Sequence, residues 1–220
     1  MHVRHRWLTL LVVTFLTAII FLFFYLYLRP VWIPEKDKPK NLTNITTITA
    51  PTVTFVNPKK GASQPKLTIV EFGDYQCESC KDLSEALDVL IRTVPEIQVI
   101  WKDMPKDSVH NLATPSAIAA RCAGDQGKFW EFHDLLFDKQ VILSNELFPA
   151  LAQEIGLDTE RFAKCFENQE TLPLVEKDLE EAVALQITAV PTVFIGDERI
   201  TGSLTAEELL SLVRTKINSQ

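Results

Sequence analysis

The sequence has too few metal ligands, in the wrong spacing, for a structural zinc site. Its 220 residues contain only four cysteines and four histidines, and His2 and His5 precede a long apolar run. Cys77 and Cys80 form one Cys-x-x-Cys motif, but a second such motif and a closely spaced histidine pair are both missing. Because a structural zinc ion takes four ligands, we expect no bound metal.

An excess of basic residues is also missing from most of the chain. Residues 1–40 carry six Lys or Arg and two Asp or Glu, whereas residues 41–220 carry 16 basic and 27 acidic residues. An acidic domain lacks the basic face that nucleic-acid binding requires, and it is not attracted to anionic lipid. We therefore expect no nucleic-acid partner and interpret the acidity as a contribution to solubility. The sequence contains no internal repeat.

A long apolar run lies near the N-terminus. Residues 7–28 are 22 consecutive uncharged and mostly apolar positions, which matches the ~20 residues of a transmembrane helix. A cleaved signal peptide has a shorter apolar region and small residues at its cleavage site, and Leu26–Pro30 offers none. We therefore expect an uncleaved signal anchor. Arg4 and Arg6 precede it, which keeps residues 1–6 in the cytoplasm.

The anchor is followed by a proline-rich and Thr/Asn-rich segment, residues 29–52, which we interpret as an extended linker. The predicted topology is a single-pass membrane protein whose C-terminal domain lies on the periplasmic or extracellular side. Four cysteines in such a domain fit an oxidising compartment and allow two pairs.

The Cys-x-x-Cys motif lies where a predicted strand meets a predicted helix. The strand is 67–72, and the helix that follows has an apolar face. A thiol at a helix N-terminus meets unpaired N–H groups and the positive end of the helix dipole, which favour the thiolate. Cys80, one turn later, is placed to form a disulfide with Cys77. The motif therefore predicts a dithiol–disulfide exchange site.

The remaining pattern predicts an α/β core with a helical insertion. Short strands are expected at 53–56, 97–101, 192–195 and 199–201, helical segments between 112 and 185, and a final helix at about 205–217. A strand–helix–strand unit at the start of the domain requires a parallel crossover. We expect the core to comprise residues 53–108 and 187–220, and the helical insertion to comprise residues 109–186.

Three segments resemble the DsbA-like group of the thioredoxin superfamily, which are membrane-tethered or periplasmic thiol–disulfide oxidoreductases. The matching segments are 70–80 with the sequence VEFGDYQCESC, 122–133 with CAGDQGKFWEFH, and 190–195 with VPTVFI. The resemblance spans about residues 55–217. A dithiol motif followed some 110 residues later by a proline-led strand is a specific combination.

The resemblance implies a thioredoxin-like core with a helical domain inserted after Trp101. It implies that Cys77 attacks or holds the substrate sulfur and that Cys80 resolves the mixed disulfide. It also implies that Pro191 has a cis peptide bond, lies against the cysteine pair, and turns the backbone of Val190 toward an extended substrate chain. Without the resemblance, a trans proline at the start of an edge strand would be the ordinary interpretation.

Cys122 and Cys165 lie 43 positions apart in the helical block. They could be two buried free cysteines, which behave as small apolar residues. They could also form a structural disulfide between two helices of the insertion. The oxidising compartment favours the disulfide.

Glu71 lies on the predicted buried strand, six residues before Cys77. A buried acid has a raised pKa and could exchange a proton with Cys80. The resembling family has an acid at this position. An exposed carboxylate at a strand edge is the alternative, and Lys102 is a weaker candidate for an ion pair with Glu71.

The residues between the two cysteines depart from the family pattern, in which proline followed by histidine or an aromatic residue is common. Here Glu78 and Ser79 occupy these positions. An acid next to a thiolate disfavours ionisation, so we expect Cys77 to be less acidic, and the disulfide less oxidising, than in the strongest oxidases of this group.

Together these features predict a membrane-tethered, extracytoplasmic oxidoreductase that introduces disulfides into exported proteins. No cofactor is needed, because the Cys77–Cys80 pair itself carries two electrons. Expected partners are unfolded or thiol-containing exported proteins and, by resemblance, a membrane quinone-linked reoxidant. A protein-disulfide reductase or isomerase of the same fold is the alternative. A non-enzymatic, tethered assembly or metal-delivery factor that binds Cu(I) through the dithiol also remains open. We expect a monomer.

Overall fold

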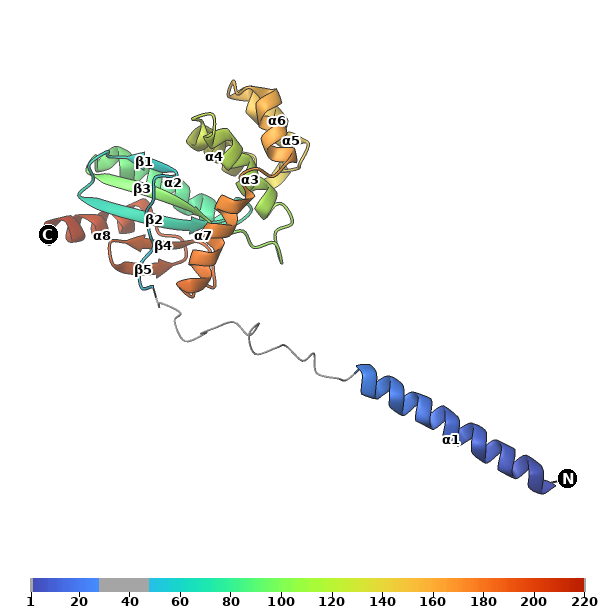
Figure 1. Ribbon diagram of the computed structural model, residues 1–220. Helices are drawn as coiled ribbons and strands as arrows, with labels where there is room; N and C mark the ends of the chain where they lie inside the picture. Colours follow the sequence, from blue (N-terminus) through green and yellow to red (C-terminus); the bar gives the residue numbers. More distant parts are fainter. Residues whose placement is uncertain (1, 28–47, 220) are drawn as a thin grey trace. The chain divides into compact units, whose positions relative to one another are not determined.

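The computed structural model describes residues 2–27 and 48–219, which fall into two separate units (Figure 1). The first contains the 26-residue helix α1 (His2–Tyr27). Within the described residues, no helix meets the combined length and hydropathy of a membrane span. The last anchor residue and linker residues 29–47 lie outside the described residues, so the anchor stays a prediction from the sequence.

The second unit alternates strands and helices in the order expected for an α/β core. Its elements are β1 (Lys59–Gly61), β2 (Leu67–Gly73), α2 (Glu78–Thr93), β3 (Ile97–Asp103), α3 (Ala113–Gly124), α4 (Phe129–Asp138), the 3-10 helix η2 (Gln140–Ile142), α5 (Leu147–Glu154), α6 (Thr159–Glu167), α7 (Leu172–Ala184), β4 (Thr192–Ile195), β5 (Glu198–Thr201) and α8 (Ala206–Asn218).

The strands form one sheet in the order β1-β3-β2-β4-β5. Strands β2 and β3 are parallel, as the strand–helix–strand pattern predicted, and the other neighbours are antiparallel. Strand β2 is central, and Glu71 is paired with Trp101 of β3 and with Val193 of β4. Glu71 therefore lies in the middle of the sheet, with β3 hydrogen-bonded to β2 on one side and β4 on the other.

Helices cover both faces of the sheet (Figure 1). Helices α2 and α8 pack on one face, where Leu87 and Leu209 meet Ile69. The other face holds Phe72, which packs near Ala182 of α7. Successive strand residues point to opposite faces, so this division follows the alternation along β2.

Two sequence predictions about the core need correction. Residues 53–56 form a turn rather than a strand, and the edge strand is β1, a few residues later. Helix α7 packs against the sheet rather than only within the helical block. Helix α7 contacts the sheet cluster through Ala182 and the helical cluster through Val175, whereas the sequence predicts a place for it only within the insertion, 109–186. The sequence pattern of α7 resembles that of α3–α6 because an amphipathic helix has one apolar face whether it packs on a sheet or on other helices.

A buried cluster of charges joins β3, α3 and α7. The guanidinium of Arg121 donates from Nε to Asp103 Oδ2 at 2.6 Å and from Nη2 to Asp178 Oδ2 at 2.5 Å. Lys102 Nζ donates to Asp178 Oδ1 at 3.1 Å and to Glu181 Oε2 at 2.6 Å. Both basic side chains are about 97–98% buried, and each has two carboxylate partners.

This cluster corrects the suggested pairing of Lys102 with Glu71. Lys102 is opposite Phe72 in the register, so its side chain shares the face of α7, whereas Glu71 points to the other face. Glu71 and Lys102 differ by one position in the register of β2 and β3, so their side chains lie on opposite faces of the sheet.

The segment before β1 is also fixed to the domain. Thr52 donates its hydroxyl to Glu181 Oε1 at 2.6 Å, the Val56 carbonyl accepts from Arg121 Nη1 at 3.2 Å, and the Pro58 carbonyl accepts from Trp101 N at 3.1 Å. Ile48 also packs against the core, so the end of the predicted linker, residues 48–52, lies on the folded unit.

Cys122 of α3 and Cys165 of α6 form a disulfide with an S–S distance of 2.00 Å and a Cα–Cα distance of 5.9 Å. Their exposed fractions are 1% and 5%. Of the two alternatives from the sequence, the structural disulfide is the one found, and it joins two helices of the insertion.

Candidate active site

Cys77 is the N-cap residue of α2, immediately after the turn that follows β2. Its backbone is extended (φ −85°, ψ 117°), and its Sγ accepts a hydrogen bond from the backbone N–H of Cys80 at 3.2 Å. A cysteine here takes the place that Ser, Thr or Asp usually occupies as a helix cap. The sulfur therefore lies at the positive end of the helix dipole, as the sequence predicted.

The surroundings of Cys77 lower its pKa from 9.0 to about 6. The largest cause is a hydrogen bond from the Cys80 side chain to the Cys77 sulfur, and Ser79 and the Cys80 backbone contribute further hydrogen bonds. The Ser79 Oγ lies 3.3 Å from the sulfur. Burial and the charge of Asp74 oppose these effects but do not cancel them. At neutral pH, Cys77 is therefore a thiolate and a nucleophile.

The effect of Glu78 on the redox potential of the disulfide stays a prediction, but Glu78 is not a main contributor to the pKa of Cys77. Its side chain is exposed, and it is not among the groups that most affect the pKa of Cys77. The helix turns Glu78 toward solvent, where water screens its charge. Ser79 lowers the pKa of Cys77 instead, so of the two residues it is the one that favours the thiolate.

Cys80 is the buried member of the dithiol. It is 0% exposed, whereas Cys77 is 7% exposed, and both are free thiols. Burial is the main reason that the pKa of Cys80 is strongly raised, and the neighbouring Cys77 adds to the effect. The two sulfurs thus differ in access and in charge, with Cys77 outward and ionised and Cys80 inward and protonated.

Val190 and Pro191 lie next to Cys77, although they are more than 110 residues away in the sequence. The Val190–Pro191 peptide bond is cis, as the resemblance implied. The Cys77 Sγ is 3.7 Å from the Val190 carbonyl oxygen, to which the thiol form donates a hydrogen bond. The structure therefore brings together the four residues Cys77, Cys80, Val190 and Pro191.

Glu71 lies on β2 and is 2% exposed, so the buried alternative is the correct one. Burial, followed by the charges of Cys77 and Asp88, raises its pKa to about 8, and Lys60 partly opposes the increase. Among the described residues, its Oε1 atom has no hydrogen-bond partner. A carboxyl group with this pKa can gain or lose a proton near neutral pH.

Trp101 is the neighbour of Glu71 on β3, and it stacks on Tyr75 with ring centroids 4.9 Å apart. A Cβ atom at Gly73 would collide with the Trp101 ring, so the close approach of this ring requires glycine. Behind the redox motif, these rings and the buried His133 form an apolar wall. Apolar surroundings of this kind account for the desolvation of Glu71 and Cys80.

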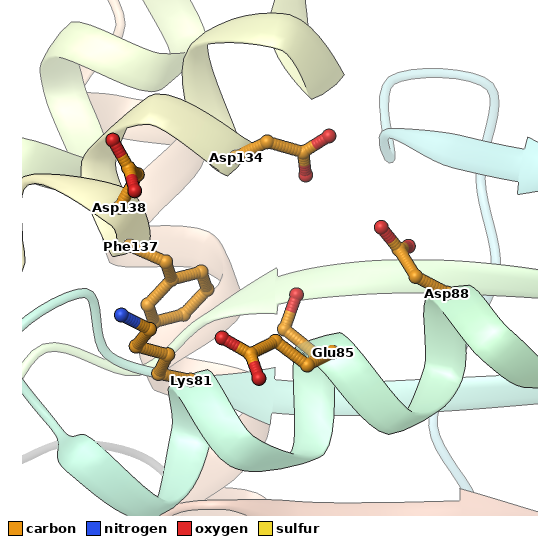
Figure 2. A pocket seen from close by; sticks show the side chains of 7 residues that line it. Lys81, Glu85, Asp88, Asp134, Phe137 and Asp138 are labelled. Atoms are coloured by element: carbon orange, nitrogen blue, oxygen red, sulfur yellow. The ribbon is translucent and has the colours of Figure 1, made fainter. Parts of the chain in front are cut away.

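A small acidic cleft of about 120 Å³ lies between α2 and α4 (Figure 2). Its lining consists of Lys81, Ser84, Glu85, Asp88, Asp134, Phe137 and Asp138. Lys60 of β1 contacts the carboxylates of Asp88 at 2.5 Å and Asp134 at 3.8 Å. Within the residues that the structure describes, no group of three or more His, Cys, Asp or Glu side chains is arranged to hold a metal.

A family model described as thioredoxin matches residues 56–215, which include the whole of this site. The chain belongs to the thioredoxin family. Among solved structures, it is similar to a periplasmic thioredoxin-like protein from Salmonella enterica serovar Typhimurium, with 27% identity and a TM-score of 0.62 over 74% of this chain and 91% of that one. It is also similar to the thiol–disulfide exchange protein alpha-DsbA2 from Wolbachia pipientis, with 22% identity and a TM-score of 0.65 over 75% and 87% of the two chains.

These neighbours share the thioredoxin-like fold that the resemblance implied. A curated relative, the Na(+)/H(+) antiporter NhaA 1 of Salinispora arenicola, is 33% identical over 154 residues, which cover 70% of this chain and 24% of that protein. The chain thus spans about a quarter of the length of the curated relatives it matches, and ion transport is not assigned to it.

Gln140 is a site residue of this thioredoxin-family domain that the sequence analysis missed. Its side-chain amide donates to the carbonyl oxygens of Tyr75 at 2.8 Å and Cys77 at 3.0 Å. It comes from η2 in the insertion, more than 60 residues after the redox motif. A lone glutamine in a helical block carries no spacing signal, so only the tertiary structure could reveal this contact.

The pKa of Glu71 predicts a specific pH dependence of stability. The pKa of Glu71 in the folded protein, about 8, lies above the ordinary 4.5. Its contribution to the free energy of unfolding is therefore fully present below pH 4.5 and is lost as the pH rises through 8. We expect the free energy of unfolding of Glu71→Gln, minus that of the wild type, to increase by on the order of 3 kcal/mol between pH 5 and 8. Urea unfolding of the reduced proteins across this range measures the difference.

Cys77 has the opposite sign, because its lowered pKa adds stability as the pH rises above 6. It is present in both proteins, so the comparison removes its contribution to first order. A stability difference between Glu71→Gln and the wild type that stays constant from pH 5 to 8 would show that Glu71 ionises normally.

Proposed function

We propose that the protein is a membrane-tethered, extracytoplasmic thiol–disulfide oxidoreductase that introduces disulfides into exported proteins. The observation that carries this proposal is the asymmetry of the dithiol. The Cys77 sulfur caps α2, has a pKa of about 6 and faces Val190, while Cys80 is buried behind it. An outward thiolate and an inward thiol are the two parts that disulfide exchange requires.

The reaction starts from the Cys77–Cys80 disulfide. A substrate thiolate attacks the sulfur of Cys77, the Cys77–Cys80 bond breaks, and a mixed disulfide forms between Cys77 and the substrate. A second substrate thiolate then attacks the substrate sulfur and releases Cys77 as a thiolate. Two electrons have passed from the two substrate thiols to the pair, and the substrate has gained a disulfide.

Glu71 handles the proton of the buried cysteine in this proposal. Cys80 leaves as a thiolate in the first step, and its raised pKa means that it must be protonated quickly. Glu71 influences the pKa of Cys80 through its charge, and its own pKa of about 8 allows it to supply a proton at neutral pH. The same group accepts the proton when Cys80 attacks in reverse.

The low pKa of Cys77 favours the oxidase direction. A thiolate that is stabilised in the reduced protein makes the corresponding disulfide a better oxidant, and Cys77 is also the better leaving group in the second step. Glu78, which favoured a reductase in the sequence, is exposed, so water screens its charge. Beside the site, Val141 and Ile142 follow Gln140 and are 97% and 64% exposed, which suits contact with unfolded chains.

Localisation outside the cytoplasm is supported by the buried Cys122–Cys165 disulfide and by the periplasmic source of the Salmonella neighbour. The proposed single-pass anchor rests on the apolar run at 7–28 and on the exposed apolar side chains of α1, such as Phe21 at 78%. The proposed partners are thiol-containing exported proteins and a membrane quinone-linked reoxidant that returns the dithiol to the disulfide.

Stoichiometric exchange tests the proposal. The oxidised protein, mixed with a reduced two-cysteine peptide, should form one peptide disulfide per Cys77–Cys80 disulfide reduced, and Cys77→Ala should form none. Equilibration with glutathione then gives the potential, and a value more oxidising than the glutathione pool supports an oxidase. A protein that purifies with bound copper and exchanges no disulfides would instead support the metal-delivery alternative.

A further inference from the structure

The loop between β3 and α3, residues 104–112, contacts both segments that flank Cys77. The backbone N–H of Lys106 donates to Asp74 Oδ2 at 2.9 Å, next to the redox motif. The side chain of the same lysine donates from Nζ to the Thr188 carbonyl oxygen at 3.1 Å. Thr188 is two residues before Val190, so the single residue Lys106 contacts both the segment next to the redox motif and the cis-proline segment.

His110 of the same loop holds the Asp74 carboxylate from a second direction. Its Nδ1 lies 2.9 Å from Asp74 Oδ2, while Asp74 Oδ1 accepts from the backbone N–H of Gln76 at 2.8 Å. The Asp74 side chain is completely buried, and its carbonyl oxygen accepts from Cys77 N at 3.1 Å. Gln76 is tied to the loop as well, through Leu112 N.

We propose that Lys106 and His110 are positioning residues, with His110 fixing the Asp74 carboxylate beside Cys77 and Lys106 fixing the Val190–Pro191 segment against the redox motif. This inference rests on the proposed function and adds to it a division of roles. One residue acts on the attacking sulfur, and the other acts on the Val190–Pro191 segment, which we propose to bind the substrate chain.

The effect of His110 on Cys77 is electrostatic and passes through Asp74. The charge of Asp74 opposes ionisation of Cys77. An imidazole N–H that donates to Asp74 Oδ2 withdraws part of that charge, so removing it strengthens the repulsion between the carboxylate and the thiolate. The charged groups of the same loop are engaged elsewhere, since Lys106 binds Thr188 and Asp107 binds Thr114.

The effect of Lys106 is geometric. Its ammonium group bonds a backbone carbonyl of the cis-proline segment, and its own backbone bonds Asp74. When the side-chain bond is lost, Thr188 is released but the contact with Asp74 remains. Lys106→Met therefore loosens the Val190–Pro191 segment without changing the charge that Cys77 experiences directly from Asp74.

The reduced full-length protein tests the His110 part without requiring exchange activity. The rate of Cys77 alkylation by iodoacetamide, followed against pH, gives the pKa of this thiol. We expect His110→Ala to raise that pKa by about one unit and Asp74→Asn to lower it. In the Asp74→Asn background, His110→Ala should cause no further shift. Ser108→Ala, an exposed position in the same loop, is the matched control.

Peptide oxidation kinetics test the Lys106 part. We expect Lys106→Met to raise KM by about three- to ten-fold with kcat unchanged, as for the loss of one hydrogen bond, and Lys106→Arg to restore KM. The alkylation profile of Lys106→Met should match that of Ser108→Ala. Thermal unfolding of each variant confirms that it is folded before the values are compared.

Each result has a definite meaning. If the wild type forms no peptide disulfide, the proposed function fails, and the alkylation data still decide the part played by His110. If the wild type is active but His110→Ala and Lys106→Met behave like Ser108→Ala in alkylation and in KM, the loop only stabilises the fold and the inference is overturned. A shift from His110→Ala that persists in the Asp74→Asn background would also overturn it.

Discussion

Replacing Cys80 by serine should turn the protein into a trap for its partners. Cys77 would still cap α2 and would keep the Ser79 hydrogen bond, so its thiolate could attack a partner disulfide, break that bond and form a mixed disulfide while the other partner sulfur leaves as a thiolate. Without the Cys80 sulfur, no internal thiol could displace the partner, and the complex should persist. Multiple-turnover oxidation of a peptide should fall on the order of a thousandfold, because substrate oxidation starts from the Cys77–Cys80 disulfide, which this variant cannot form.

Non-reducing electrophoresis and mass spectrometry measure the trapping. The expected complexes contain Cys77 joined to one partner cysteine, and they dissociate in dithiothreitol. Partners that are disulfide-bonded in wild-type cells but reduced in cells lacking the protein would establish the oxidase direction. The reverse pattern would establish a reductase.

Cys77→Ser is the matched control, since the remaining Cys80 is 0% exposed and has a strongly raised pKa. It should capture nothing above background. Equal capture by the two single variants would mean that the two sulfurs are equivalent, which contradicts the division between an outward thiolate and a buried thiol.

Arg121→Met should cause the largest loss of stability of any single change considered. Methionine fills much of the same space but leaves Asp103 and Asp178 without the two bonds that Arg121 Nε and Nη2 donate. A buried charge that loses its partner typically costs about 3–5 kcal/mol. The effect should extend to Trp101, because Asp103 also accepts from its indole Nε1 at 2.7 Å.

Urea unfolding of the oxidised proteins at pH 7 measures this loss. Lys216→Met removes a solvent-exposed pair with Asp197 and should leave the unfolding midpoint nearly unchanged. If Arg121→Met is no more destabilising than Lys216→Met, the buried cluster has no net role in stability. A loss of more than 3 kcal/mol would instead identify it as the main electrostatic support between the sheet and the helices around it.

The sequence contained strong signals for the centre of the site. Cys77 and Cys80 follow a buried strand directly, and Pro191 opens a later strand, so their chemistry could be inferred from spacing and resemblance. Glu71 was a weaker case, because alternation alone leaves its exposure open. Its burial depends on β3 and β4 lying on either side of β2, which the sequence does not specify residue by residue.

Other features depend on directions in space that one sequence does not encode. The suggested pairing of Lys102 with Glu71 was wrong because the register places the two side chains on opposite faces. The exposure of Glu78 in the first turn of α2, where it is not a main contributor to the pKa of Cys77, could not be inferred from the sequence either. Gln140 and His110 reach the site from loops that are distant in sequence and contain no recognisable motif.

The position of the Cys122–Cys165 bond has a consequence for how this protein is made. Its sulfurs are almost completely shielded, so the thiols and disulfides that meet Cys77 at the surface do not reach them. The crosslink must therefore be installed while the helices around it are still open. Each new molecule thus has to receive this disulfide from another oxidant during folding, because its own Cys77 cannot reach these sulfurs once the helices have closed.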